Sequence, residues 1–228
     1  MLLKIESVLS TEEVAAARRL LAQSDWVSGE VSAGPLAAVV KHNQQVAEGS
    51  APLAELRQIV LAALHRAPEF FAAALPLKVL PPQFNRYQGA SNRYGFHTDN
   101  AMRLAPDRPG TYVRSDISAT LFLSDPADYD GGELTIADTF GNHGVKLAAG
   151  SLVLYPSSSV HAVAPVTRGE RLASFMFIQS MIRDAEQRRL LYDMDMALLA
   201  LRAQVGESEP VVRLTGTYHN LLRRWAET

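Results

Sequence analysis

The sequence predicts an α+β protein in which a jelly-roll-like antiparallel β core lies between two helical regions. Three observations carry this prediction. Residues 1–77 and residues 182–228 contain apolar residues at helical spacing, and residues 78–181 contain short segments of strand type separated by turn residues. Because no long helical segment separates the central strands, an antiparallel sandwich or barrel is favoured over a parallel Rossmann sheet. These boundaries define an N-terminal helical region, a core and a C-terminal helical extension.

The composition is that of a globular protein with a sizeable core. Of the 228 residues, 47% are apolar and 20% are charged, and 22 basic residues against 24 acidic ones give a net charge of −2. This balance argues against a nucleic-acid binder that relies on positive charge. The most apolar stretch, residues 59–80, is interrupted by charged residues and prolines, so we expect no membrane span and a cytoplasmic protein. Cysteine is absent, so any metal must be held by nitrogen or oxygen ligands.

The N-terminal region is predicted to contain two helices. Ser10, with Glu13 three residues later, is a capping-box pattern that starts the first helix. Apolar residues then recur at helical spacing at Val14, Ala17 and Leu21, and in a second helix at Leu53, Leu56, Val60 and Leu64. The polar segment 42–45 between the helices is expected to be a loop, either solvated or at the entrance of a site.

The core is predicted from strand-like segments and the turns between them. The expected strands are 77–80, 83–87, 117–123, 133–136, 145–147, 151–155 and 172–178, with turns at 141–142, 149–150 and 168–170. The C-terminal extension is expected to form a helix over 184–202, a break at 206–210 and a last helix that ends near Trp225. Its apolar faces either cover the core or form the surface of a homo-oligomer.

Four residues of the predicted core form a chemically coherent set. His97 and Asp99 are alternate residues on extended chain, so their side chains point to the same side. This pair is weak evidence by itself, but His161 follows 64 residues later. Two imidazoles and one carboxylate are the ligands of non-haem Fe(II) oxygenases. Arg171 follows His161 by ten residues and offers a bidentate fork for the carboxylate of a co-substrate.

With these residues in view, the chain resembles a known family. The order of its motifs is similar to that of the Fe(II)/2-oxoglutarate dioxygenases of the prolyl-4-hydroxylase type. The whole chain resembles the bacterial PKHD-type hydroxylases, including their polar Asn-Gln-Gln segment and their helical C-terminal extension. The matching elements are Asn43-Gln44-Gln45, Tyr87 with a following glycine, Tyr94-x-x-His97-x-Asp99, Gly131-Gly132-Glu133-Leu134, His161 and Arg171.

The resemblance implies a double-stranded β-helix, a cofactor set and a reaction. Fe(II) would be held by His97, Asp99 and His161, and 2-oxoglutarate would chelate the iron and place its distal carboxylate on Arg171. Tyr87 matches a tyrosine that hydrogen-bonds this co-substrate. With O2, a small-molecule or peptide substrate would be hydroxylated and succinate and CO2 released, with L-ascorbate as a further candidate cofactor and iron homeostasis as a candidate role.

One position departs from the pattern. Many prolyl hydroxylases carry a tyrosine on the strand after the His-x-Asp motif, where this chain has Phe122. Thr120 or Tyr112 is expected to supply the missing hydroxyl group.

Two other functions are compatible with the residues. A non-catalytic β-barrel could bind a metal or a small carboxylate for a partner protein. A zinc-dependent, cupin-like enzyme also suits two histidines and a carboxylate, although it leaves Arg171 without a role. Arginines near the motif are expected to be scattered surface charge or, alternatively, a mouth that attracts an acidic substrate; they are Arg86, Arg93, Arg103, Arg108 and Arg114.

Overall fold

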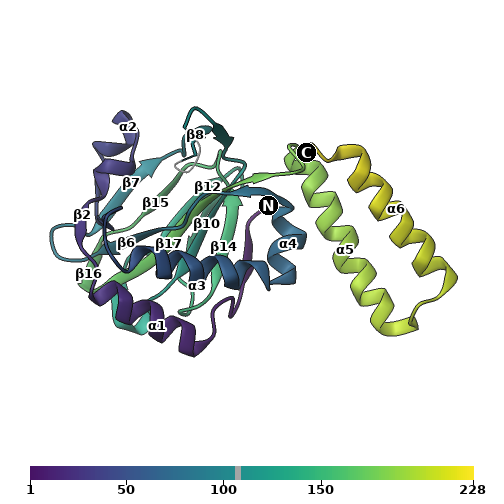
Figure 1. Cartoon of the computed structure of the whole chain (residues 1–228), viewed down its shortest axis with the longest axis horizontal. Helices are drawn as coiled ribbons and strands as arrows, with labels where there is room; N and C mark the ends of the chain where they lie inside the picture. The colour runs from purple at the N-terminus through teal and green to yellow at the C-terminus, as the bar shows by residue number, and fades with distance from the viewer. Residues whose placement is uncertain (106–108) are drawn as a thin grey trace.

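Two antiparallel sheets pack face to face, and helices cover the outer side of the larger one (Figure 1). The computed structural model describes residues 1–105 and 109–228. Across the large sheet the strands run β1 (Leu3–Ile5), β14 (Leu152–Pro156), β10 (Ile117–Phe122), β17 (Arg171–Ser180), β6 (Gln83–Tyr87), β4 (Gln44–Val46) and β2 (Trp26–Ser28), and β5 (Pro76–Val79) also pairs with β17. The predicted α+β jelly-roll architecture is confirmed.

The second sheet carries fewer strands and forms the other wall of the core. Its order is β13 (Gly141–Val145), β12 (Leu134–Asp138), β15 (His161–Val163), β7 (Arg93–His97) and β3 (Lys41–His42). Two short pairs flank the sheets: β11 (Tyr129–Gly131) with β16 (Val166–Gly169), and β8 (Met102–Leu104) with β9 (Tyr112–Arg114).

The four longest helices lie where the sequence predicts them. The helices are α1 (Thr11–Ala22), α2 (Pro35–Ala38), α3 (Leu53–His65), α4 (Pro68–Ala74), α5 (Ala185–Val205) and α6 (Glu209–Trp225), with short 3₁₀ turns η1 (Gly29–Ser32) and η2 (Pro126–Asp128). The Ser10–Glu13 capping box is present in both directions, since each residue's side chain accepts from the other's backbone N–H. Asp184 caps α5, and α5 ends at Gly206 with φ +67°.

The N-terminal region is less helical than predicted. The expected loop 42–45 is instead the end of β3 and most of β4, and β1 and β2 also come from this region. These strands are two or three residues long, too short to display the alternation that identifies a strand in a sequence. The predicted turn at 141–142 is also wrong, because β13 begins at Gly141 and the turn lies just before it.

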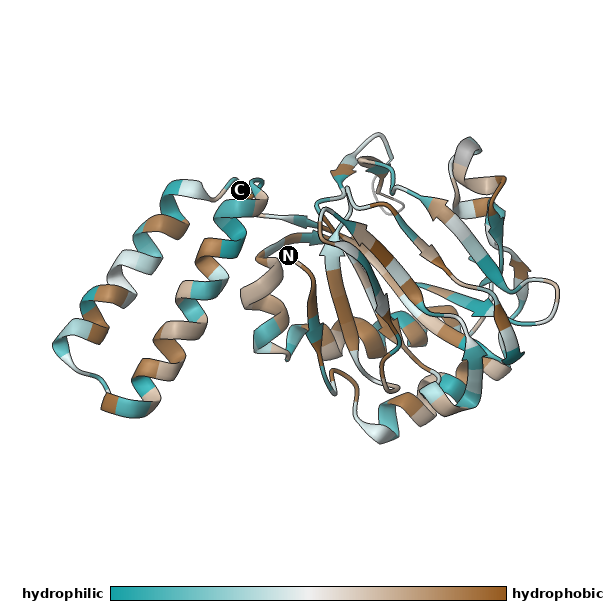
Figure 2. Cartoon of the chain, turned by 180° about the vertical axis from the view of Figure 1, so that it is seen from behind, coloured by the Kyte–Doolittle hydropathy of each residue, from teal (hydrophilic) through white to brown (hydrophobic). Residues whose placement is uncertain are grey.

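Apolar residues form two layers of the core, and Figure 2 marks in brown the hydrophobic residues along the strands and helices. One layer lies between the large sheet and helices α1 and α3, and includes Leu21, Leu56 and Leu121. The other lies between the two sheets, and includes Phe122 and Leu134. Both layers hold the strands rigidly, which is what a site built on strand residues requires. Within residues 1–105 and 109–228, no helix has both the length and the apolar character needed to cross a bilayer.

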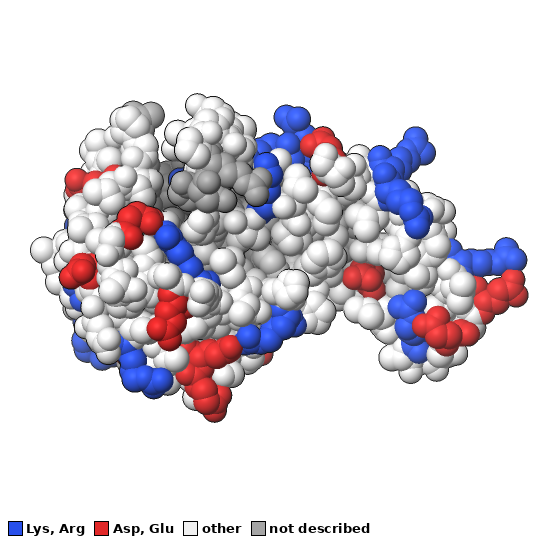
Figure 3. Space-filling view, viewed as in Figure 1, with Lys and Arg blue, Asp and Glu red and all other residues white. Residues whose placement is uncertain are grey.

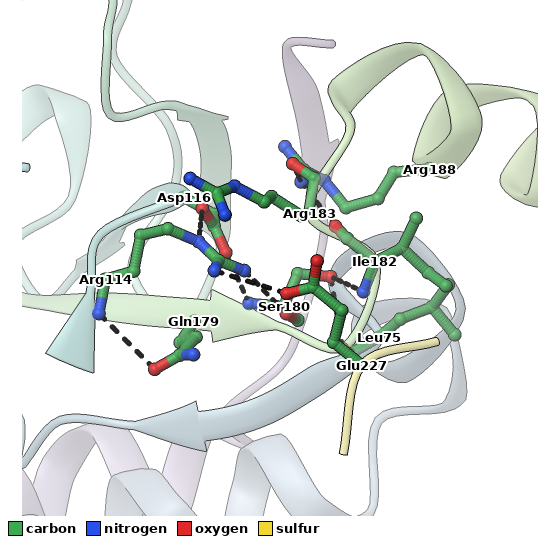
Figure 4. A network of polar contacts seen from close by, with 9 residues as sticks. All are labelled: Leu75, Arg114, Asp116, Gln179, Ser180, Ile182, Arg183, Arg188 and Glu227. Carbon is green, nitrogen blue, oxygen red and sulfur yellow. Dashed lines mark hydrogen bonds and ion pairs between the residues drawn. The ribbon is translucent and has the colours of Figure 1, made fainter. Parts of the chain in front are cut away.

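Helices α5 and α6 form a hairpin that projects from one end of the sheets (Figure 1). They pack on each other and on the end of α4 through Leu75, Ile182 and Leu191. A polar network joins the hairpin to the core (Figure 4). Arg114 of β9 donates to Asp116 at 2.7 Å and pairs with Glu227 at 3.4 Å, beyond the end of α6. The extension therefore does not cover the sheets; it is fixed to their end.

Candidate metal centre

Strand pairing brings two histidines and one aspartate together. β7 and β15 are antiparallel neighbours in which His97 and His161 lie directly opposite each other. Asp99 follows β7 by two residues, and its Oδ2 lies 3.6 Å from Nε2 of His161. One ligand atom from each of the three residues lies within 4.8 Å of the other two. This spacing fits three protein ligands on one face of a single metal ion.

Both imidazoles are oriented for metal binding through the same nitrogen. Nδ1 of His97 lies 2.8 Å from the carbonyl oxygen of Gly95, and Nδ1 of His161 lies 3.0 Å from that of Ser159. Since a carbonyl oxygen only accepts, each Nδ1 is the donor, and the lone pair of the neutral ring then lies on Nε2. Burial, followed by the neighbouring His161, lowers the pKa of His97 to about 4. His97 is therefore neutral near pH 7, as a metal ligand must be.

Asp99 is held in place by its own hydrogen-bond partners. Oγ of Ser118, on β10, donates to Oδ2 of Asp99 at 2.6 Å and lies 2.7 Å from Oγ of Ser157. Arg103 makes a longer contact with Oδ1 at 3.4 Å. These contacts fix the direction of the carboxylate before a metal arrives.

Replacing Ser118 with alanine is expected to weaken metal binding without unfolding the chain. Loss of a partner that orients a metal ligand typically costs about 10–100-fold in affinity. The check is the affinity for Fe(II), measured anaerobically by competition with a chelator. Ser174→Ala is the matched control, because Ser174 is fully buried on the neighbouring strand and its hydroxyl has no partner among the described residues. Equal affinities in both variants would show that Ser118 does not orient Asp99.

Arg171 lies in the same cavity with unused hydrogen-bond donors. Its side chain is 1% exposed, and its Nε and Nη2 atoms have no hydrogen-bond partner among the described residues. Its guanidinium carbon lies 5.1 Å from the ring centre of Tyr87 and 5.2 Å from that of Phe122. A buried cation with unpaired donors is costly unless a ligand completes it. Arg171 therefore fits an anion that enters the cavity.

The glycine pair before β12 leaves room for this arginine. Gly132 has φ +69°, and a Cβ added there would lie 3.1 Å from Cδ of Arg171 and 2.9 Å from the ring of Tyr129. Gly132→Ala is therefore expected to displace Arg171 and raise the KM for the anion that it binds. Gly89→Ala is the control, because Gly89 also has a positive φ, of +53°, but nothing lies within 4 Å of the added atom. A similar KM in both variants would remove the steric explanation.

The other predicted residues separate into those inside and those outside the cavity. Tyr87 is buried in its wall beside Arg171, which it faces in register across β6 and β17. Thr120 also lines the cavity, whereas Tyr112 is 59% exposed on β9 and does not. Tyr112 was a wrong candidate for the missing hydroxyl group, because β9 lies at the edge of the core. Phe122, which stands where many prolyl hydroxylases carry a tyrosine, packs against Arg171.

Three lining residues had no clear signal in the sequence. Tyr155, on β14, is buried with its ring edge-on to His161 at 5.0 Å. Asn85, on β6, donates to the hydroxyl group of Tyr87 at 3.4 Å. Lys41, on β3, is 3% exposed, and burial, followed by the charge of Arg103, lowers its pKa to about 8. A lysine so deeply buried is rare and points to a functional role, but only the pairing of β3 with β7 reveals it.

Of the arginines considered for the mouth of the site, Arg103 lines the cavity. Arg86 contacts Gln44 and the ring of Trp26, and Arg114 belongs to the network at the C-terminal hairpin. Arg93 is exposed on β7, and Arg108 lies outside the described residues. The predicted segment Asn43-Gln44-Gln45 does not line the cavity; Asn43 and Gln45 are buried behind it.

Known proteins match this chain over its whole length. Residues 82–179 match the family described as the 2OG-Fe(II) oxygenase superfamily, and residues 185–227 match the PKHD-type hydroxylase C-terminal domain. PKHD-type hydroxylases of Nitrosomonas europaea and of an Azoarcus species are 66% and 67% identical, each over all of both chains. Among solved structures, the carbocyclase SnoK of nogalamycin biosynthesis, a non-haem α-ketoglutarate-dependent enzyme, superposes with a TM-score of 0.56 at 16% identity. That match covers 79% of this chain and 80% of SnoK, and it supports the fold.

These findings decide among the functions considered from the sequence. The non-catalytic module and the zinc-dependent enzyme are not supported, and the expectation of an oxidoreductase is confirmed. The chain belongs to the PKHD-type hydroxylases, a family of 2OG-Fe(II) dioxygenases.

Proposed function

We propose that this dioxygenase binds Fe(II) through His97, Asp99 and His161 and binds the distal carboxylate of 2-oxoglutarate through Arg171. It uses O2 to hydroxylate a small molecule or a peptide and releases succinate and CO2. The proposal includes L-ascorbate as an added cofactor and a role in iron homeostasis, both of which rest on the family resemblance alone.

The residues present fit both groups. Two imidazoles and one carboxylate suit Fe(II) and leave positions on the metal for other ligands. A dicarboxylate that chelates the metal at one end needs a cation at the other. The observation that carries the proposal is the buried Arg171, whose unpaired donors lie in the same cavity as the three ligands.

When bound, iron and 2-oxoglutarate supply the oxidising chemistry with O2. The chain's own residues position these groups and shield them from water. His97 and His161 present Nε2, while Ser118 holds Asp99 at the required angle. Arg171 and the hydroxyl group of Tyr87 select and orient the co-substrate, and the apolar side chains between the two sheets exclude water from that end of the cavity.

The direct test is the stoichiometry of co-substrate turnover. The protein is supplied with Fe(II), 2-oxoglutarate and O2, and succinate and oxygen are measured together. Equal amounts of succinate formed and oxygen consumed, in an iron-dependent reaction, are expected even at the slow rate of turnover without substrate. Succinate formation that needs no iron, or none in protein with iron bound, would contradict the proposal.

A further inference from the structure

A second group of cations lies in the cavity, away from Arg171. Four alternate residues of β17 line it: Arg171, Ala173, Phe175 and Phe177. Arg171 is at one end of this row. At the other end, Nζ of Lys41 lies 5.4 Å from the ring centre of Phe175, and the guanidinium of Arg103 lies 3.5 Å from that of Phe177. Phe175 and Phe177 lie four and six residues along β17 from Arg171, roughly 13 and 20 Å of extended strand, so these cations form a group separate from Arg171.

Lys41 is directed at the metal centre. In the pairing of β3 with β7, Lys41 lies opposite Tyr94, and its Nζ is 5.3 Å from the centre of that ring. The ring of Tyr94 stacks on the imidazole of His97 with centres 3.6 Å apart. One aromatic ring therefore separates the ammonium group of Lys41 from an iron ligand.

The ammonium group is held by a chain of buried and half-buried polar side chains. Nζ donates to Oγ of Ser32 at 2.8 Å, and Ser32 donates to Oε1 of Gln45 at 2.6 Å. Gln45 in turn donates to Gln83 at 2.8 Å. Gln45 of the Asn43-Gln44-Gln45 segment thus has a positioning role behind Lys41. Ser32 is the hydrogen-bond partner that the described residues give the ammonium group, so its other two N–H donors are free for a ligand.

Positive charge exceeds negative charge in this cavity. Among its described lining residues, Lys41, Arg103 and Arg171 face a single carboxylate, that of Asp99. Fe(II) and the dianion of 2-oxoglutarate cancel each other and leave the excess in place. On the face of the molecule drawn in Figure 3, by contrast, residues of both signs are intermingled. Asp99, whose Oδ1 lies 3.4 Å from Arg103, offsets only one of the cavity's positive charges. The remaining positive charge is costly inside a protein, so a bound anion would stabilise this region.

We infer that the substrate carries an anionic group of carboxylate type, which Lys41 and Arg103 bind above the aromatic side chains of Tyr94, Phe175 and Phe177. This inference rests on the proposed function, because it assigns the substrate class of the same site. Lys41 and Arg103 are substrate-positioning residues in this account.

The test compares two probes that differ in charge and share a shape. Benzoate and benzamide are titrated anaerobically into protein loaded with Fe(II) and 2-oxoglutarate, and binding is followed by calorimetry. The visible charge-transfer band of the iron chelate shows in each sample that the co-substrate stays bound. A hydrogen bond to a charged group contributes about 1.5–3 kcal/mol, so benzoate should bind at least about 10-fold more tightly than benzamide.

Variants of Lys41 test whether this residue causes the preference for benzoate over benzamide. Lys41→Met should abolish the preference for benzoate, Lys41→Arg should retain it, and Lys4→Met, at an exposed position of β1, should match the unaltered protein. The charge-transfer band checks that each variant is folded and loaded. If the unaltered protein forms no band, the proposed function itself is wrong, and the inference falls with it. If the band forms but benzoate has no advantage, or neither probe binds, or the advantage survives in Lys41→Met, only the inference is wrong.

Discussion

Replacing Arg171 with methionine is expected to raise the KM for 2-oxoglutarate by about 100-fold or more. Two charge-assisted hydrogen bonds at about 1.5–3 kcal/mol each would be lost, and each 1.4 kcal/mol corresponds to a factor of ten. The unaltered arginine is 1% exposed with unpaired donors, so its removal from the protein without co-substrate is not expected to lower the Tm. Steady-state kinetics of succinate release and a thermal melt of the apoprotein measure the two effects.

The nearby Arg168 provides the control for this result. Arg168 lies on β16, the strand that precedes β17 in the chain, and pairs with Asp130 at 2.7 Å, but both side chains are 58% exposed. Arg168→Met should leave the KM unchanged, because an exposed pair of this kind contributes little. An unchanged KM in Arg171→Met would mean that the co-substrate binds elsewhere. A large loss of stability without a change in KM would make Arg171 a structural residue.

Loss of one metal ligand is the second large effect. His161→Ala and Asp99→Ala are each expected to lower the affinity for Fe(II) by more than about 100-fold, since even the partners that orient ligands contribute about 10–100-fold. Turnover of 2-oxoglutarate should fall to background in both. Anaerobic metal titration and succinate release provide the measurements.

A second histidine and aspartate in the chain give a matched control. His143 lies 2.9 Å from Asp138 on the hairpin of β12 and β13, where both side chains are more than 40% exposed. His143→Ala should bind iron as the unaltered protein does. If His161→Ala also retains iron and activity, then the three residues brought together by β7 and β15 are not the metal site.

Local signals predicted some of these features well. The capping box at Ser10 and Glu13 marks the start of α1, because both of its hydrogen bonds form within four residues of chain. The break at Gly206 separates the two C-terminal helices for the same kind of reason. A turn of helix is specified by its own residues, so a sequence pattern is enough to place it.

Features that depend on strand pairing were harder to predict. The motif order suggested that His97 and His161 share a site, but their direct opposition is set by the register of β7 and β15. Lys41 enters the cavity because β3 pairs with β7. β3 is two residues long, which is too short for a sequence pattern to predict the strand or its pairing. Arg103 and Arg114 look alike in the sequence, but β8 directs the first to Asp99 while the second on β9 joins the C-terminal network.

We propose that one cavity binds Fe(II) through His97, Asp99 and His161 and 2-oxoglutarate through Arg171. Anaerobic addition of Fe(II) and then 2-oxoglutarate to the apoprotein tests it most directly. We expect a visible metal-to-ligand charge-transfer band that is absent in His161→Ala and that needs far more 2-oxoglutarate in Arg171→Met. No band in protein that demonstrably binds iron, or an identical titration in both variants, would contradict it.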